Sequence, residues 1–339
     1  MKFNIDQFVT QLLANFSPKQ RRVVVGRFGL KDGERLTLQE IGDEFGITRE
    51  RVRQIEENAI QKLTPQVKEA AASFISDVKD KLKKAGGVRR NKEFMEDIEK
   101  DLGGIGLVKN APQKLAFMFL IGGAPLYEKE TDEMHDFWYS DEESKKKFSD
   151  FIKLVLKFFK SSGKEEILNK KAYLSEFPNF ASQHFITISK NFGKNVFGDF
   201  GLRDWPEIEP KTIRDKAYLV LRRHGKPLHF ENIAKFISSY GIDTHSAHIQ
   251  TVHNELIKDG RFVLVGRGIY GLREHGYEPG TVKEVIARLL KKSGPLSSER
   301  VVKLVNEQRL LKENTILLSL QNKKNFKKLD DGKYHIYEA

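Results

Sequence analysis

The stretch that most constrains this chain is residues 36–63, which read LTLQEIGDEFGITRERVRQIEENAIQKL. Thr37 is followed three residues later by Glu40, which is the capping-box spacing that starts a helix. Apolar side chains then recur every three to four residues, at Leu38, Ile41 and Phe45. Gly46 ends this pattern because glycine has a low helix propensity. The first half of the stretch therefore predicts one short amphipathic helix.

The second half of the stretch predicts a longer helix, which begins after a tight turn at Gly46-Ile47. Thr48 is placed to cap it. Its apolar positions recur at i, i+3, i+7 and i+11, namely Val52, Ile55, Ala59 and Leu63. Because this apolar seam must pack inward, polar side chains near the start of the helix point outward. They are Arg49, Glu50, Arg53 and Gln54.

Two short helices joined by a tight turn form a helix-turn-helix, in which the start of the second helix meets base edges in the DNA major groove. Arg and Gln side chains make bidentate contacts with bases there, and Glu accepts a hydrogen bond from cytosine. The alternative is an ordinary helical hairpin with a solvated charged face. The capping box, the glycine turn, the apolar seam and the outward polar side chains together favour the helix-turn-helix.

Residues 27–63, and ITRERVRQIE most specifically, closely resemble region 4 of the sigma-70 family of bacterial transcription initiation factors. In that family this domain recognises the −35 element of the promoter. The resemblance implies that double-stranded promoter DNA is a partner, and it implies base contacts from four side chains. These are Arg49, Glu50, Arg53 and Gln54. It also implies that Thr48 and Arg51 contact phosphates.

The segment before residue 27 completes a four-helix domain over residues 1–66. Residues 3–16 are amphipathic, with Phe8, Leu12, Leu13 and Phe16 at helical spacing. We interpret this face as core. The resemblance leaves open a second role, in docking on the β flap of the RNA polymerase core. We find no counterpart of sigma region 2, the domain that melts the −10 element, and therefore expect that the protein does not open promoters alone.

The charge distribution indicates a polyanionic partner. The formal net charge of the 339 residues is +12. Residues 1–66 have 11 basic and 9 acidic side chains, whereas residues 211–339 have 24 basic and 14 acidic ones. We therefore expect electrostatic affinity for nucleic acid to concentrate in the C-terminal third of the chain.

Downstream of residue 66, a pattern of three helices and an aromatic hairpin repeats. FGLRDWPEIEPKTIRDKAYLVL aligns with YGLREHGYEPGTVKEVIARLL roughly 70 residues later, which indicates an internal repeat. Three helices followed by a hairpin form a winged helix. The predicted fold class is therefore mainly α, with a four-helix sigma region 4-like helix-turn-helix domain followed by tandem winged-helix units with small antiparallel β-hairpins. The predicted units are residues 67–138 (the weakest copy), 139–210, 211–278 and 279–339.

Residues 212–273 resemble the HARE helix-turn-helix domain, a winged helix found in the delta subunit of bacterial RNA polymerase and in some DNA-associated proteins. KPLHFENIAKFI and DGRFVLVGRGIYGL carry this resemblance. The third helix of the unit is predicted over residues 246–258, with Ile249, Val252, Leu256 and Ile257 facing inward. Its outward polar positions and the wing tip supply candidate DNA contacts. They are His248, Gln250, Thr251, Asn254 and Arg267. The alternative is a protein-docking module without DNA contact.

The sequence contains no recognisable catalytic or cofactor motif. GRGIYG at residues 266–271 matches the dinucleotide fingerprint, but no helix begins at its third glycine, so we interpret it as a wing turn. No cysteine or nearby carboxylate accompanies His245, His248 and His253 to complete a metal site. We assign these histidines to the polar surface of the third helix. We therefore predict a protein that is not an enzyme and that has no cofactor and no metal.

These features predict a sequence-specific DNA-binding transcription factor that recognises −35-like promoter elements together with bacterial RNA polymerase. The lack of cysteine, of a signal peptide and of any long apolar run fits a cytoplasmic, nucleoid-associated protein. The main alternative is a delta-like accessory subunit of RNA polymerase whose winged helices dock on protein. A nucleic-acid enzyme is a third alternative, because some HARE domains accompany restriction enzymes.

Overall fold

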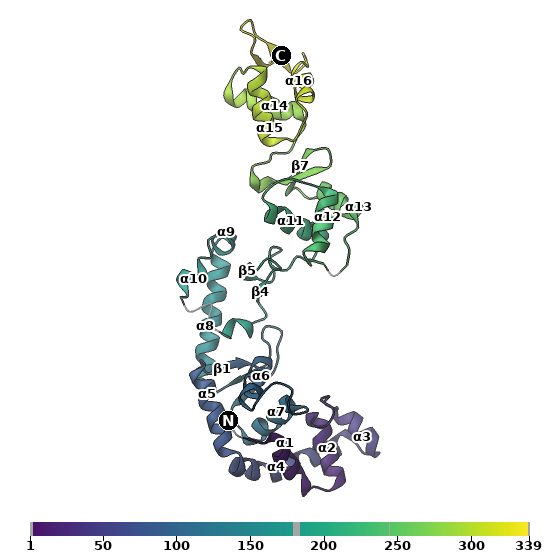
Figure 1. Ribbon diagram of the computed structural model, residues 1–339, viewed down its shortest axis with the longest axis vertical. Helices are drawn as coiled ribbons and strands as arrows, with labels where there is room; N and C mark the ends of the chain where they lie inside the picture. The colour runs from purple at the N-terminus through teal and green to yellow at the C-terminus, as the bar shows by residue number, and fades with distance from the viewer. Residues whose placement is uncertain (1–2, 179–183, 244, 338–339) are drawn as a thin grey trace. The chain divides into compact units, whose positions relative to one another are not determined.

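The computed structural model describes residues 3–178, 184–243 and 245–337. The chain divides into two compact units, Met1–Phe192 and Gly193–Ala339 (Figure 1). Helices predominate, and the strands form small antiparallel sheets of two or three strands. The predicted mainly α fold class is therefore confirmed. Among the described helices, none is long and apolar enough to cross a membrane.

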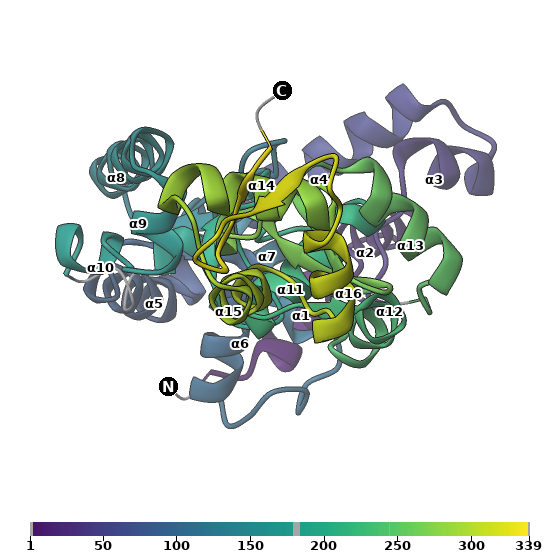
Figure 2. The same ribbon diagram turned by 90° about the horizontal axis from the view of Figure 1, so that it is seen from above.

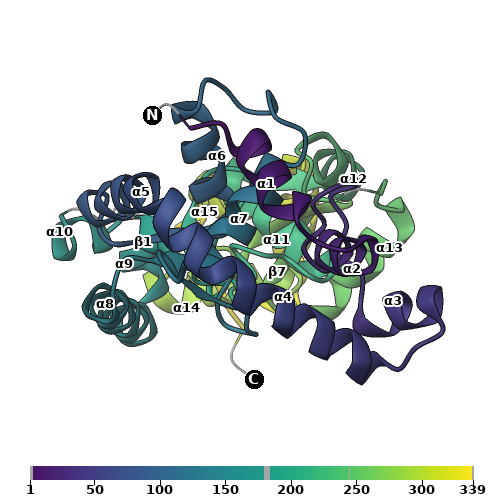
Figure 3. The same cartoon turned by 90° about the horizontal axis from the view of Figure 1, so that it is seen from below.

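The N-terminal helices form where the capping pattern predicts them. α1 (Ile5–Ala14) and α2 (Pro18–Phe28) precede the predicted pair α3 (Leu38–Phe45) and α4 (Arg49–Ala70). The side chains of Thr37 and Glu40 form the expected capping box at the start of α3. Figure 3 shows α3 beside the first turns of α4, at the end of α4 that is remote from α5.

The apolar face of α1 is core, as predicted, and this core extends beyond residue 66. Leu12, Leu13 and Phe16 are buried in one cluster with side chains of three later helices. These helices are α5 (Ala72–Lys84), α6 (Asn91–Asp101) and α7 (Ala111–Gly122). α7 is apolar on nearly every face because other helices surround it. The boundary predicted at residue 66 falls inside α4, which continues through Pro65 to Ala70.

Three short strands complete this part of the first unit. They are β1 (Val88–Arg90), β2 (Leu126–Glu128) and β3 (Phe137–Tyr139), paired antiparallel in the order β1-β3-β2. All three side chains of the central strand β3 are buried. The Trp138 Nε1 donates a hydrogen bond to Asn91 Oδ1 at 2.7 Å, which satisfies the polar atom of a ring that is otherwise enclosed by apolar groups.

The remainder of the first unit is a long amphipathic helix followed by short ones. These elements are α8 (Glu142–Ser161), α9 (Lys164–Leu168), α10 (Tyr173–Glu176) and the 3-10 helix η2 (His184–Thr187). α8 buries an apolar stripe of Phe148, Ile152, Val155 and Phe159. The first unit ends at the first residue of β4 (Phe192–Lys194), which forms a two-stranded sheet with β5 (Phe200–Leu202).

The second unit contains the predicted HARE-like domain. Its elements are α11 (Ile213–His224), β6 (Leu228–His229), α12 (Phe230–Ser239), α13 (Ile249–Lys258), β7 (Phe262–Gly266), β8 (Ile269–Leu272) and η3 (Arg273–His275). The sheet order is β6-β8-β7. The prediction that Ile249 and Ile257 face inward is wrong, since they are 42% and 64% exposed. α13 begins later than expected and buries only Val252 and Leu256.

The chain ends in a further set of three helices and a hairpin. They are α14 (Val282–Ser293), α15 (Ser298–Gln308), α16 (Glu313–Leu320), β9 (Phe326–Lys328) and β10 (Tyr334–Ile336). Leu296 forms an isolated antiparallel bridge with Tyr334 of β10. Figure 2 shows the yellow hairpin beside α14, and apolar side chains of this helix and the hairpin share one core.

The same order of elements occurs in three stretches of the chain. Residues 72–139 and 213–272 each contain helix, strand, helix, helix, strand and strand, and the first strand pairs with the last. Residues 282–336 repeat this order, with the bridge at Leu296 in place of the first strand. This order is that of a winged helix. The division into five domains at residues 66, 138, 210 and 278 stays a proposal.

Candidate nucleic-acid interface

Two glycines shape the turn between α3 and α4. Gly46 has φ 62° and ψ 35°, the left-handed region in which glycine carries no penalty from a side chain. The Ile47 N–H donates to the Gly42 carbonyl at 2.9 Å. A Cβ on Gly42 would lie 2.7 Å from the Ile47 carbonyl oxygen. The sequence pattern does not indicate that Gly42 must be glycine, because this requirement comes from the close approach of the Ile47 backbone.

A small core holds the two helices together. Val23, Ile41 and Val52 are fully buried, and they join α2, α3 and the first turns of α4. Leu36, Leu38, Phe45, Ile47 and Ile55 pack around them, half-buried. The Arg27 Nε donates to Glu56 Oε2 at 3.0 Å, so an ion pair also joins α2 to α4. The predicted apolar seam therefore fixes which face of α4 is left outward.

The outward face at the start of α4 carries the side chains that the resemblance to sigma region 4 assigns to DNA contact. The Thr48 Oγ1 accepts from the Arg51 N–H at 3.2 Å and caps the helix. Its use as a cap leaves the hydroxyl hydrogen free to donate to a phosphate. The predicted base-contacting side chains are all exposed on the first two turns. They are Arg49, Glu50, Arg53 and Gln54.

Glu50, Arg53 and Gln54 are already paired with side chains of the same helix. Arg53 donates from Nε and Nη2 to Glu50 at 2.9 and 2.7 Å, and its Nη1 pairs with Glu57 one turn later. Arg51 Nη1 donates to Gln54 Oε1 at 3.0 Å. Glu57 is not among the residues predicted from the sequence, although its i+4 spacing from Arg53 indicates such a pair. A base contact by Arg53 must therefore replace two carboxylate partners.

The ion pairs also fix the charge states of this face. The hydrogen bond from Arg53 lowers the pKa of Glu50, with smaller effects from the charges of Arg53 and Arg49. The Glu50 hydrogen bond and the charges of Glu50 and Glu57 raise the pKa of Arg53. Both side chains are exposed, Arg53 to 46% and Glu50 to 56%, so water screens these interactions. The face therefore presents charged donors and acceptors at neutral pH without a large energetic barrier to rearrangement.

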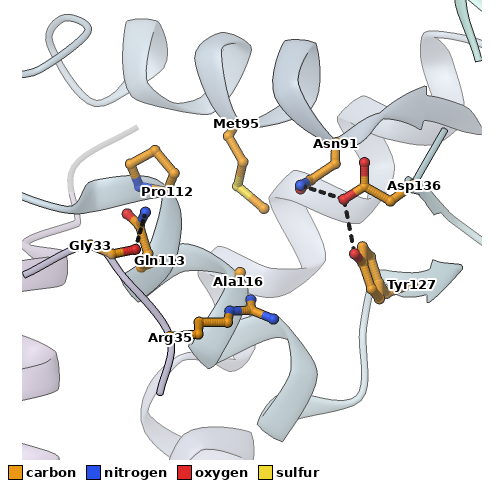
Figure 4. A pocket seen from close by; sticks show the side chains of 9 residues that line it. All are labelled: Gly33, Arg35, Asn91, Met95, Pro112, Gln113, Ala116, Tyr127 and Asp136. Carbon is orange, nitrogen blue, oxygen red and sulfur yellow. Dashed lines mark hydrogen bonds between the residues drawn. The ribbon is translucent and has the colours of Figure 1, made fainter. Parts of the chain in front are cut away.

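The loop that leads into α3 is held by α7 and by the turn before it. The Asn110 Nδ2 donates to the Lys31 carbonyl at 2.6 Å, and the Gln113 Nε2 donates to the Gly33 carbonyl at 3.2 Å. A cavity of about 290 Å³ lies beside this contact, and Arg35 and Tyr127 are among the residues that line it (Figure 4). Asp136 Oδ2 accepts hydrogen bonds from Tyr127 and from Asn91. The bonds from Asn110 and Gln113 therefore tie the loop before α3 to the rest of the first unit.

The HARE-like domain leaves all its predicted DNA contacts exposed. His248 occupies the N-cap position of α13, and Gln250 Nε2 donates to Asn254 Oδ1 at 3.3 Å on the next turn. Thr251 is exposed on the same helix, and Arg267 is exposed between β7 and β8. These positions lie on two elements, the third helix and the wing.

His253 does not belong to that polar surface, which corrects the sequence-based assignment. Its ring stacks on Phe230 with centroids 4.2 Å apart and meets the edge of Tyr270. His253 is half-buried. The residue therefore packs α13 on α12 rather than facing a ligand.

Two family models match the chain. Residues 12–64 match sigma-70, region 4. Residues 211–275 match the HARE-HTH family, the helix-turn-helix domain of ASXL proteins and restriction endonucleases. Both resemblances found from the sequence are thereby confirmed, and the first match contains α2, α3 and the outward face of α4.

Curated relatives resemble this chain over the first of these segments. RNA polymerase sigma factor SigA of Clostridium acetobutylicum is 49% identical over 53 residues, 16% of this chain and 14% of the relative. SigA1 of Synechococcus elongatus is 52% identical over 52 residues, 15% and 13% of the two chains. Sigma factor sigB of Arabidopsis thaliana is 46% identical over 57 residues, 17% and 10%. The chain therefore covers about a seventh or less of each relative's length.

Proposed function

We propose that this protein binds double-stranded DNA sequence-specifically in bacterial transcription and recognises a −35-like promoter element through the start of α4. The proposal rests on the outward face of α4, in the segment that resembles sigma region 4. Thr48 caps this helix, and its apolar side is buried. On the outward face, Arg49, Glu50, Arg53 and Gln54 are exposed within two helical turns. An α-helix of this kind fits the major groove.

The chemistry of each side chain suggests its role. Arg49 and Arg53 can each make a bidentate contact with guanine, and Gln54 can do so with adenine. Glu50 can accept from a cytosine amino group. Thr48 and Arg51 at the helix start are placed for phosphates, which fix the register of the helix without reading sequence. The pairing of Arg53 with Glu50 holds the guanidinium near the position from which it would contact a base.

We further propose that RNA polymerase is the protein partner. This follows from the similarity to sigma factors and not from a surface seen in the structure. The apolar side chains of α1 pack inside the first unit, against α7 among others. Contact with the β flap would therefore use other side chains than Leu12, Leu13 and Phe16.

The test is selection of bound DNA from a random duplex pool with wild type, Arg53→Ala and Lys62→Ala. Lys62 is an exposed cation near the middle of the same helix and serves as the control. We expect wild type and Lys62→Ala to enrich one −35-like motif. Arg53→Ala should lose roughly five- to one-hundredfold in preference for it while keeping its non-specific affinity. Equal weakening on every sequence would show that Arg53 does not read bases.

A specific observation favours a second candidate for the HARE-like domain, namely docking on polymerase as a delta-like accessory subunit. Besides Ile249 and Ile257 on α13, Leu264 on β7 is 54% exposed. Exposed apolar side chains that form one contiguous patch are typical of protein-binding surfaces. Binding of purified core polymerase should then weaken in Ile257→Asp and not in Gln250→Ala. If duplex DNA affinity instead weakens in Gln250→Ala and not in Ile257→Asp, this domain binds DNA.

A further inference from the structure

The second unit contains a groove in which apolar, aromatic and basic side chains meet. It lies between the end of α16 and the β9–β10 hairpin and encloses about 590 Å³. Leu320 and Phe326 are buried and form its floor. Tyr334 and Tyr337 line it as well, and Tyr337 is 53% exposed. An exposed aromatic ring above an apolar floor offers a surface on which a flat group can stack.

The groove is also strongly basic. Lys323, Lys327 and Lys328 line it. Over residues 245–337, none of these three lysines forms an ion pair, whereas the neighbouring Lys333 pairs with Asp331 at 2.9 Å. The Lys328 Nζ lies 6.0 Å from the centroid of the Tyr334 ring. Three like charges gathered around one groove repel one another, and an anion bound there would relieve this repulsion.

The position of these charges argues against the usual use of a winged helix. The third helix of this domain, α16, reads ENTILLSL and has no basic residue beyond Lys312 at its N-cap. Its exposed side includes Leu318, which is 70% exposed. A helix of this composition is poorly suited to the phosphates that flank a major groove. The cations instead follow the helix and continue along β9.

We propose that this groove binds an unpaired nucleic-acid strand, with the lysine ammonium groups on successive phosphates and a base stacked on the Tyr337 ring. In duplex DNA, neighbouring base pairs cover the flat faces of each base. An exposed tyrosine ring in a basic groove can therefore stack only on unpaired bases. Combining a cationic track with aromatic stacking is the general solution for single-strand binding. The proposal does not depend on base reading by α4.

The test is fluorescence anisotropy with the full chain and three labelled probes, a twelve-nucleotide oligo-dT, the equivalent oligo-rU, and a duplex of the same length. A single strand should bind more tightly than the duplex, and the better of dT and rU identifies the sugar. Tyr337→Ala should weaken single-strand binding by about five- to one-hundredfold. Tyr337→Phe should retain it, because the ring face survives.

Charge is tested separately with matched triple variants. Replacing Lys323, Lys327 and Lys328 with Gln should make the slope of log affinity against log salt less steep by about 2, at roughly 0.7 per phosphate contact. The control replaces Lys283, Lys291 and Lys292 of α14, which are exposed lysines of the same domain outside the groove. Equal effects of the two triples on oligo-dT binding would overturn the proposal. So would a Tyr337→Ala variant that loses strand and duplex affinity by the same factor, since other parts of the chain are proposed to bind duplex. Arg53→Ala should leave oligo-dT binding unchanged, which separates this site from the one on α4.

Discussion

The helix-turn-helix rests on a smaller core than the rest of the first unit, and this difference predicts local unfolding. Ile41 is fully buried with only Val23 and Val52 as fully buried partners. The larger cluster contains residues from α1 to β3, including Leu115 on α7. Replacing Ile41 with Ala should therefore loosen α3 and the start of α4 while the larger cluster stays folded.

The magnitude follows from the atoms removed. Ile41→Ala deletes three buried carbons, which removes about 2.4 kcal/mol at roughly 0.8 kcal/mol per methylene. The cavity left behind raises the loss to about 2.5–4 kcal/mol if the neighbours relax only partly. Since about 1.4 kcal/mol corresponds to a factor of ten, amide exchange through local opening should accelerate by roughly 60- to 700-fold in α3.

The assay is amide hydrogen exchange followed by mass spectrometry, with Leu115→Ala as the comparison. In Ile41→Ala, peptides from α3 and the first turns of α4 should exchange faster while those from α7 keep their protection. Leu115→Ala should accelerate exchange in both regions, because the larger core supports the whole unit. Uniform acceleration in Ile41→Ala would refute the idea that the helix-turn-helix opens on its own.

Two further predictions concern pH and salt. Burial and the hydrogen bond to Asp136 raise the pKa of Tyr127 to about 12 from its ordinary value of 10. The neutral phenol therefore stabilises the fold fully below pH 10, and this contribution is lost as pH rises toward 12. Tyr127→Phe should flatten that alkaline loss of stability in chemical unfolding, and an unchanged profile would contradict the assignment. For DNA, the excess of 24 basic over 14 acidic residues in 211–339 predicts a steep loss of duplex affinity with salt, and a flat titration would exclude this electrostatic contribution.

The parts of the molecule that follow from local rules could be predicted from the sequence. Capping by Thr37 and Thr48, the turn at Gly46 and the seam of Val52, Ala59 and Leu63 all depend on residues within a few positions of one another. The order of elements in the HARE-like domain is equally local. Apolar periodicity predicts which face of a helix is buried, so the exposure of Arg53 and its neighbours could be predicted as well.

Features that depend on distant segments were not predictable in the same way. The packing against α7 joins residues about a hundred positions apart for α1 and about fifty for α4. Periodicity predicts that a face of each helix is buried, but not which segment covers it. The misplaced Ile249 and Ile257 show the same limit, since apolar spacing predicts a buried face only where another element covers it. The stacking of His253 on Phe230 likewise depends on a contact between two helices.

The charge distribution bears on how the two proposed nucleic-acid sites differ. In the first site, Arg53 has two carboxylate partners, and residues 1–66 have only two more basic than acidic side chains. Little of its affinity for DNA would come from net charge, so contacts with base edges would contribute a larger share of it. In the second site, three lysines lie together without ion pairs within residues 245–337. Strand binding there would depend strongly on salt and weakly on sequence, so raising the salt concentration should abolish oligo-dT binding before it abolishes the sequence preference of α4.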